Sequence, residues 1–192
     1  MAGRDTKPWF ARSRLVAFLA GGAAALALVG VGALAVVETG AFDAAATKPH
    51  SHIVYWATHA AMIHSVRVRA LAVTPPASFT PAQVQAGFDA YQDHCVACHG
   101  GPGTGHAPWA GGLNPDPPYL LDASQRWRRA ELYWIIEHGV KMTAMPSWRN
   151  TLSEGQIWDT VAFLEAMPAI PPTAYLAMAR AHAAQHPSAA QP

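Results

Sequence analysis

Both cysteines of the chain, Cys95 and Cys98, lie within one short stretch, YQDHCVACHGGPG at residues 91–103, and His99 follows the second one directly. Two thiols and an imidazole this close in sequence lie in one small site in any fold. The chemistry of that site therefore limits which folds the chain can adopt, because the fold has to present these three side chains together.

Four kinds of site use two cysteines at this spacing: a redox-active disulfide, half of a zinc site, a structural disulfide and thioether attachment of haem. A closed zinc site needs about four ligands, and the chain has no second cysteine pair. A thioredoxin-like dithiol is expected beside a sheet, and a disulfide that closes so short a loop contributes little stability. With His99 the motif reads C-x-x-C-H, the c-type haem attachment signature. The sequence predicts one covalent haem c, bound through Cys95 and Cys98 with His99 on the iron.

A second constraint is the stretch of residues 15–37, which contains no charged side chain. As a helix it would span roughly 34 Å, enough for the ~30 Å hydrocarbon core of a bilayer. Basic residues precede it and the acidic Glu38 and Asp43 follow it, so the positive-inside rule places the N-terminus in the cytoplasm. A cleaved signal peptide, with "ALA" at 33–35 as the cleavage site, is the alternative. We expect an uncleaved anchor because the apolar stretch is longer than a signal core.

Composition divides the chain into five segments: a basic N-terminus (1–14), the anchor (15–37), a juxtamembrane helix with a proline linker (38–79), a compact domain (80–168) and an Ala- and Pro-rich tail (169–192). In the juxtamembrane segment, apolar residues at helical spacing, among them Ile53, Trp56 and Ile63, predict an amphipathic helix close to the membrane surface. We expect the tail to be ordered only in part, around AYLAMARAHA.

The compact domain is predicted to be all-α, with helices over about 81–94, 128–138 and 153–167. TPAQ at Thr80 and SEGQ at Ser153 are capping boxes that begin the first and third helices, and a glycine ends the second. The glycine- and proline-rich residues 100–122 predict a loop. So small a core is marginally stable alone, and a large bound cofactor would supply apolar surface.

Downstream, HGVKMTAMPSW at residues 138–148 places a Met-Pro pair after a helix that ends in glycine. With the C-x-x-C-H motif, residues 80–168 resemble class I c-type cytochromes, particularly the compact domain of bacterial oxidase and dehydrogenase subunits. The resemblance implies that Met145 is the sixth iron ligand. Met142 is the rival, and simple packing of both methionines is the other interpretation. A thioether ligand raises the haem potential, which suits electron transfer toward an oxidase.

The resemblance also assigns roles on the first helix, where Gly87, Tyr91 and Cys95 recur every fourth residue. In the family such a glycine lets the last helix cross closely, and the aromatic residue covers the haem edge. Phe163 and Trp158 on the last helix are the expected partners. Packing alone would explain these residues equally well.

Around the haem, the resemblance implies that the histidine donates its second ring nitrogen to a proline carbonyl. In NPDPPYL at 114–120, Pro118 is our first choice, and Pro117 is adjacent. Four tryptophans are expected to line the haem: Trp109, Trp127, Trp134 and Trp148. Of these, Trp109 or Trp127 is expected to bond a haem propionate.

Charged and imidazole side chains leave alternatives open. Four arginines are candidates to neutralise propionates or to form a docking rim, with a solvated surface as the alternative: Arg126, Arg128, Arg129 and Arg149. Four histidines in the juxtamembrane segment are expected to be solvated or interfacial, rather than ligands of copper or a second haem: His50, His52, His59 and His64. Residues 80–168 carry nine acidic and five basic side chains, which excludes a basic field for nucleic acid.

The sequence therefore predicts an electron carrier rather than an enzyme: a monohaem cytochrome c tethered to the bacterial inner membrane, with its haem domain in the periplasm. Its expected partners are a redox donor and acceptor, such as an oxidase, a dehydrogenase or another cytochrome complex. The first alternative is the cytochrome subunit of a fixed dehydrogenase or terminal oxidase complex, with residues 44–73 as the docking surface. The second is a haem enzyme or gas sensor with an open iron position.

Overall fold

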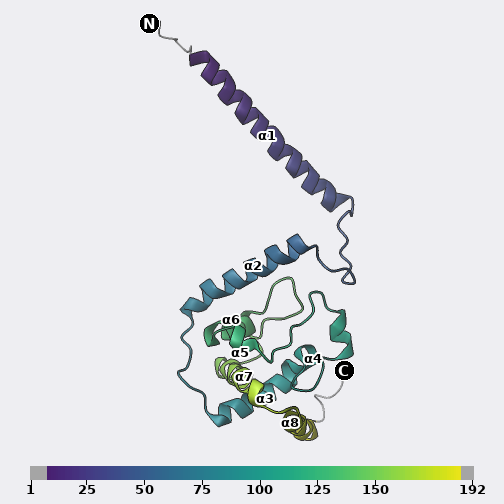
Figure 1. The fold of residues 1–192 in the computed structure, drawn as a ribbon, viewed down its shortest axis with the longest axis vertical. Helices are drawn as coiled ribbons and strands as arrows, with labels where there is room; N and C mark the ends of the chain where they lie inside the picture. Colours follow the sequence, from purple (N-terminus) through teal and green to yellow (C-terminus); the bar gives the residue numbers. More distant parts are fainter. Residues whose placement is uncertain (1–7, 187–192) are drawn as a thin grey trace. The chain divides into compact units, whose positions relative to one another are not determined.

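The computed structural model describes residues 8–186, which fall into two units, one ending at Ala45 and one beginning at Ala46. Regular secondary structure in these residues is helical, and the isolated bridge between Gly101 and Thr104 forms no strand. The predicted all-α fold is confirmed. Figure 1 shows the order of the helices along the chain.

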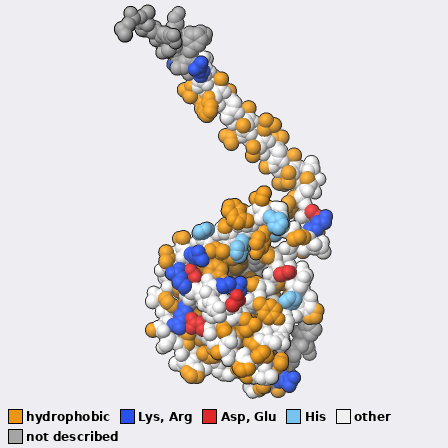
Figure 2. All heavy atoms as spheres, viewed as in Figure 1, with side chains coloured by type: hydrophobic (Ala, Val, Ile, Leu, Met, Phe, Trp, Pro, Cys, Tyr) orange, Lys and Arg blue, Asp and Glu red, His pale blue; other side chains and the backbone are white. Residues whose placement is uncertain are grey.

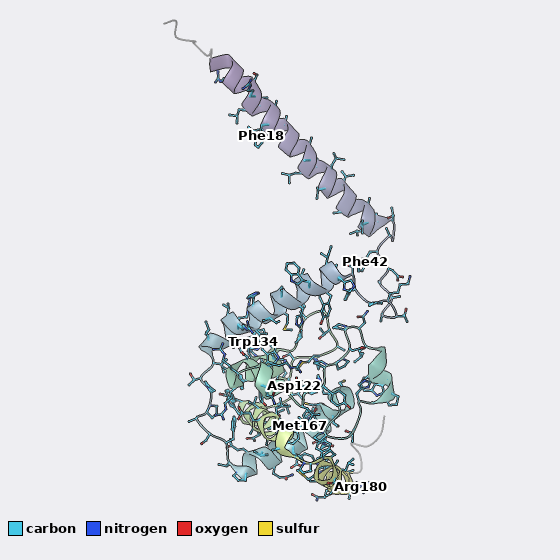
Figure 3. The ribbon with its side chains drawn as sticks, in the orientation of Figure 1. Phe18, Phe42, Asp122, Trp134, Met167 and Arg180 are labelled. Atoms are coloured by element: carbon cyan, nitrogen blue, oxygen red, sulfur yellow. The ribbon has the colours of Figure 1, made fainter. Side chains whose placement is uncertain are left out.

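The first unit consists mainly of α1, Pro8–Glu38. From Arg12 onward this helix is long and apolar enough to cross a membrane. Its apolar side chains are exposed all round the helix, and Phe18 points away from it (Figure 3). A helix that is apolar on every side is typical of a membrane span.

The second unit begins with α2, His52–Arg69, which continues into the short 3₁₀ helix η1, Ala70–Ala72. The predicted helix is present. Of the apolar residues that predicted it, Ile53 and Trp56 are 77% and 70% exposed and Ile63 is half-buried, whereas Val66 is buried. Apolar residues thus occur on both sides of this helix, and one side packs on the domain.

Two helices of the domain begin at the predicted capping boxes. The hydroxyls of Thr80 and Ser153 each accept a hydrogen bond from the backbone N–H of the glutamine three residues later, and the backbone N–H of each donates to the side-chain oxygen of that glutamine. α3 therefore spans Pro81–His94, and α7 spans Glu154–Ala166. The side-chain caps satisfy N–H groups that would otherwise have no partner in the first turn.

The centre of the domain is the crossing of α3 and α7, which make the most extensive contact between helices of the described chain. At Gly87 the backbone of α7 comes so close that an added Cβ would lie 1.8 Å from the carbonyl oxygen of Asp159 and 2.9 Å from Cβ of Phe163. Only glycine permits this distance between the two backbones, as the resemblance implied for Gly87.

Aromatic rings fill the core around this crossing. Phe88 and Tyr91 of α3 lie with ring centroids 5.5 Å and 5.1 Å from that of Phe163. The other expected partner, Trp158, stacks instead on Tyr133 at 4.3 Å. Tyr133 belongs to α6, Arg129–His138, so Trp158 joins the second predicted helix to the core.

Short helices occupy the connections: α4 (Val96–His99), η2 (Pro108–Gly112), α5 (Ala123–Arg126) and η3 (Met167–Ala169). Residues 100–122 are irregular as predicted, except for the 3₁₀ turn of η2, which has a proline in its first turn. Met167, labelled in Figure 3, is fully buried where α7 ends.

The tail contains a complete helix, α8, Pro172–Gln185, which packs on α3. Tyr175 is 1% exposed, and the ring nitrogens of His182 lie 3.2 Å from Asp89 Oδ1 and 2.9 Å from Asp93 Oδ1. The predicted helical stretch of the tail is thus part of the folded domain. Its partners lie on α3, far away in sequence, so the local pattern gave no indication of this contact.

Replacing Gly87 by alanine should lower the free energy of unfolding by about 2 kcal/mol or more, because the new Cβ forces α3 and α7 apart. Chemical denaturation followed by circular dichroism measures this change. Gly155→Ala is the matched control, since its Cβ would meet nothing closer than Ser153 Oγ at 4.0 Å. It should gain about 0.5–1 kcal/mol from helix propensity. Equal stability of the wild type and Gly87→Ala would contradict the close crossing.

Candidate functional site

The C-x-x-C-H residues lie on a single turn that continues from α3. Cys95 is the C-cap residue of α3 and the N-cap residue of α4. Its carbonyl accepts hydrogen bonds from the backbone N–H groups of Cys98 and His99 at 3.1 Å and 2.9 Å. Both thiols are free. The turn therefore holds two sulfurs and one imidazole at the end of a helix whose position is fixed by α7.

The environment of the thiols is apolar. Burial, with a smaller effect of the neighbouring Cys98, raises the pKa of Cys95 to about 12. Burial also raises the pKa of the Cys98 thiol. A redox-active dithiol needs a lowered thiol pKa, so these values disfavour a thioredoxin-like role. Cys95 and Val96 pack against the hydrophobic core, as expected for a wall that faces an apolar group.

The imidazole of His99 is oriented by Pro118, whose carbonyl oxygen lies 2.8 Å from Nδ1. The carbonyl can only accept a hydrogen bond, so Nδ1 carries the proton and Nε2 keeps the lone pair that can bind a metal. Burial lowers the pKa of His99 more than this bond raises it. The neutral form, which is the one that binds metal, is therefore favoured. The hydrogen bond expected from the resemblance forms at Pro118, while the role of His99 as iron ligand stays a prediction.

The loop after His99 is held by hydrogen bonds from side chains. Tyr91, 1% exposed, donates its hydroxyl to the carbonyl of Gly100 at 2.7 Å. Gly100 has a φ of +63°, in the region that favours glycine. Farther along, the hydroxyl of Tyr119 donates to the carbonyl of Thr104. The backbone thus turns sharply after the histidine and returns toward Pro118.

The segment with the two methionines folds back on the end of α6. Gly139 has a φ of +66° and ends this helix, and an added Cβ there would lie 2.5 Å from the carbonyl carbon of Pro146. The N–H of Val140 bonds to the carbonyl of Met145 at 3.2 Å, and Ser147 Oγ donates to Glu137 O at 2.6 Å. These contacts close the segment into a short, fixed loop.

The loop separates the two candidate methionines. Met145 is half-buried and packs against the hydrophobic core, whereas Met142 is 77% exposed and has a φ of +63°. An iron held against the hydrophobic core can be bound only by a thioether that itself lies at the core and not in solvent. The geometry thus favours Met145 over Met142, and its ligation stays a prediction.

The tryptophans of the sequence analysis occupy different environments. Trp127 and Trp148 are half-buried against the core, and the ring of Trp148 lies 4.9 Å from that of His94. Trp134 stacks on His138 at 4.4 Å. Trp109, on η2, is 56% exposed. Two of the four rings therefore pack against the core, and of these Trp148 lies beside His94, the residue before the C-x-x-C-H motif. Trp109 is the most exposed of the four.

The sequence analysis missed the partners of the arginines. Each guanidinium pairs with a carboxylate: Arg126 with Asp122, Arg128 with Glu131, Arg129 with Glu165, and Arg149 with Glu137. The side chain of Glu131 is 4% exposed. Burial alone would raise its pKa, but the hydrogen bonds from Arg128 lower it. Spacings of three and four residues could have indicated the first two pairs; the others bring together residues that are farther apart.

The donor set fits a covalently bound haem. The chain offers two thiols on one turn, an imidazole with a free Nε2, a half-buried thioether on a separate loop and an apolar wall. These are the groups that thioether attachment and two axial ligands need. The hydrogen bond at Nδ1 of His99 is the clearest sign, because it leaves the other ring nitrogen free for a metal.

Replacing Tyr91 by phenylalanine should lower the free energy of unfolding by about 1–2 kcal/mol, because the buried carbonyl of Gly100 loses its donor. Burial holds the pKa of Tyr91 far above its ordinary value, so the hydroxyl keeps its proton and donates at every pH of the experiment. Tyr55→Phe, on the half-exposed Tyr55, should stay within about 0.5 kcal/mol. An equal effect of both substitutions in chemical denaturation would contradict the assigned bond.

Comparison with known protein families identifies the domain. A family model described as Cytochrome C oxidase, cbb3-type, subunit III matches residues 82–164. A search of curated proteins found no match. The matched residues include α3, the C-x-x-C-H turn, the methionine loop and most of α7. Residues 82–164 are therefore a class I c-type cytochrome domain, a family that implies covalently bound haem c with iron and haem-mediated electron transfer.

Proposed function

We propose that this chain is a membrane-tethered monohaem cytochrome c that passes single electrons between redox proteins at the outer face of a bacterial inner membrane. Cys95 and Cys98 would hold the haem through thioether bonds, and His99 and Met145 would bind its iron. The observation that carries the proposal is the hydrogen bond between His99 Nδ1 and the Pro118 carbonyl. It supports a metal-binding histidine, since it fixes the tautomer that leaves Nε2 free.

Haem c supplies an iron that changes by one electron between its ferric and ferrous forms. The task of the chain would be to hold the imidazole of His99 and the thioether of Met145 in the same place in both forms, so that little reorganises. His99 is oriented by Pro118, and Met145 belongs to a loop bonded to the end of α6. A neutral thioether favours the reduced iron and raises the potential.

The helix α1 supports a tether. In the proposal residues 15–37 span the membrane as an uncleaved anchor, residues 38–79 connect it to the cytochrome domain, and the haem domain lies in the periplasm. Tethering confines the domain near the membrane and raises its effective concentration at membrane-bound partners.

A second candidate is the cytochrome subunit of a fixed oxidase complex. The description of the matching family, which names an oxidase subunit, favours this candidate. Purification from native membranes in mild detergent separates the two. A single species without co-migrating subunits supports the tethered carrier, and stable co-purification with an oxidase supports the fixed subunit.

Replacing Met145 by alanine tests the proposed ligand. The ferric protein should lose the weak charge-transfer band of iron–thioether ligation, and its midpoint potential should fall. We expect a fall of at least about 100 mV, part of the ~0.8 V range that axial ligands set. Visible spectroscopy and a redox titration of the holoprotein measure both changes.

Met142→Ala is the matched control, since Met142 lies three residues away and is 77% exposed. It should keep both the band and the potential. A Met145→Ala protein with an unchanged spectrum and potential would refute the assigned ligand. Loss of the band in the Met142 variant instead would transfer the role to the rival residue.

A further inference from the structure

The helix α2 carries apolar side chains on two opposite faces. The inner face packs on the domain through Val66 and, in η1, Ala70, which are 1% and 3% exposed. The opposite face, here named the outer stripe, consists of Ile53, Ala57, Ala61 and Val68 in α2 and Leu71 in η1, and the exposed His64 lies between Ala61 and Val68 on this face. All five are exposed. Figure 2 shows hydrophobic side chains and histidines along this helix.

An apolar stripe of this length is unusual on a surface that meets only water. A helix that packs on its own domain needs only one apolar face, and its other face is ordinarily polar. Ile53 is 77% exposed, Leu71 is 74% exposed and Val68 is 66% exposed. Exposed apolar side chains gathered on one side of a helix mark a site of contact with another protein or with a membrane.

The charges of the segment favour a membrane as the occupant. Residues 44–88 contain no aspartate or glutamate, and their formal positive charges are Lys48, Arg67 and Arg69. The following residues, 89–168, carry nine acidic and five basic side chains. Anionic phospholipid headgroups therefore attract the segment with α2 and repel the acidic domain beyond it. This difference in charge between the two segments favours an orientation in which α2 faces the lipid.

The exposed tryptophan of α2 favours the same occupant. Trp56, in the first turns of the helix, is 70% exposed. Tryptophan and tyrosine are enriched where a protein meets the headgroup layer, because each combines an apolar ring with a polar group. Arginines with aromatic and aliphatic residues form the pattern of helices that lie in the plane of the interface.

The length of the connecting chain keeps α2 near the bilayer. α1 ends at Glu38 and α2 begins at His52, so residues 39–51 connect them. Fully extended, this connection reaches roughly 45 Å at about 3.3–3.6 Å per residue. The first turn of α2 therefore remains within reach of the surface from which the anchor emerges.

We propose that α2 is an interfacial helix, with its outer stripe inserted at the boundary between headgroups and acyl chains of an anionic phospholipid membrane. The proposal rests on the proposed anchor. It adds a second, orienting contact: the domain no longer rotates freely on its tether but presents the side opposite α2 to the periplasm.

The test measures how fast a water-soluble polyethylene glycol maleimide reacts with single cysteines introduced into the full-length holoprotein. Ala57→Cys and Ala61→Cys report on the outer stripe, and Ala177→Cys, an exposed alanine of α8, is the matched control. Wild-type protein, in which Cys95 and Cys98 are held as thioethers, gives the background. The protein is reconstituted into vesicles of phosphatidylcholine with or without phosphatidylglycerol.

In vesicles that contain phosphatidylglycerol, the cysteines at 57 and 61 should react at least about tenfold more slowly than the one at 177. Arg67→Gln with Arg69→Gln in the Ala57→Cys background should restore much of the reaction, because the electrostatic attraction is lost. The cysteine at 177 should react equally fast in both vesicle types.

Flotation of the same vesicles tests the anchor separately. A chain that does not float with the vesicles overturns both the anchor and the interfacial helix. A chain that floats while the cysteines at 57 and 61 react as fast as the one at 177 overturns the interfacial helix alone. Protection that appears only in native membranes, and not in lipid vesicles, also overturns the proposal and assigns the outer stripe to a protein partner.

Discussion

The covalent continuity between α3 and the turn that carries Cys95, Cys98 and His99 is the constraint on which the rest of the structure depends. A turn at the end of a helix is only as well placed as the helix itself. α3 is fixed because its backbone meets that of α7 at Gly87, at a distance that no residue with a Cβ allows. Two further loops complete the candidate site. One brings the carbonyl of Pro118 to His99, and the other brings Met145 to the edge of the core.

Local sequence signals predicted the domain well where the physical cause is local. The capping boxes at Thr80 and Ser153 fixed the first residues of α3 and α7, because a cap depends only on side chains three residues apart. The proline that bonds His99 came from the resemblance to a family, since nothing in residues 114–120 alone distinguishes Pro118 from Pro117. The hydrogen bond is present at Pro118.

Contacts between distant residues were beyond these signals. The helical stretch expected in the tail gave no sign that Tyr175 would be buried, or that its hydroxyl would accept a bond from Gln92 of α3 at 2.7 Å. The pair of Arg129 with Glu165 joins two helices in the same way. Periodicity predicted the helix α2 but not which of its apolar residues pack on the domain, because this helix has apolar residues on two sides.

The chain thus adds two helices to a widely used electron-transfer domain. α8 lies against α3 and the backbone just after His99, where Gly101 leaves room for the ring of Tyr175. It braces the helix that leads into the attachment turn. α2 and its continuation η1 pack on α6, and α2 turns its other apolar face outward. Both additions lie outside residues 82–164, the part that matches the family.

The mass of the mature holoprotein under denaturing conditions tests the central claim most directly, because only a covalent bond survives unfolding. The account predicts one haem per chain, a mass equal to the polypeptide plus that haem, and a pigment that stays with the protein in acidified acetone. A polypeptide mass without haem, together with a pigment that the solvent extracts, would contradict attachment through Cys95 and Cys98.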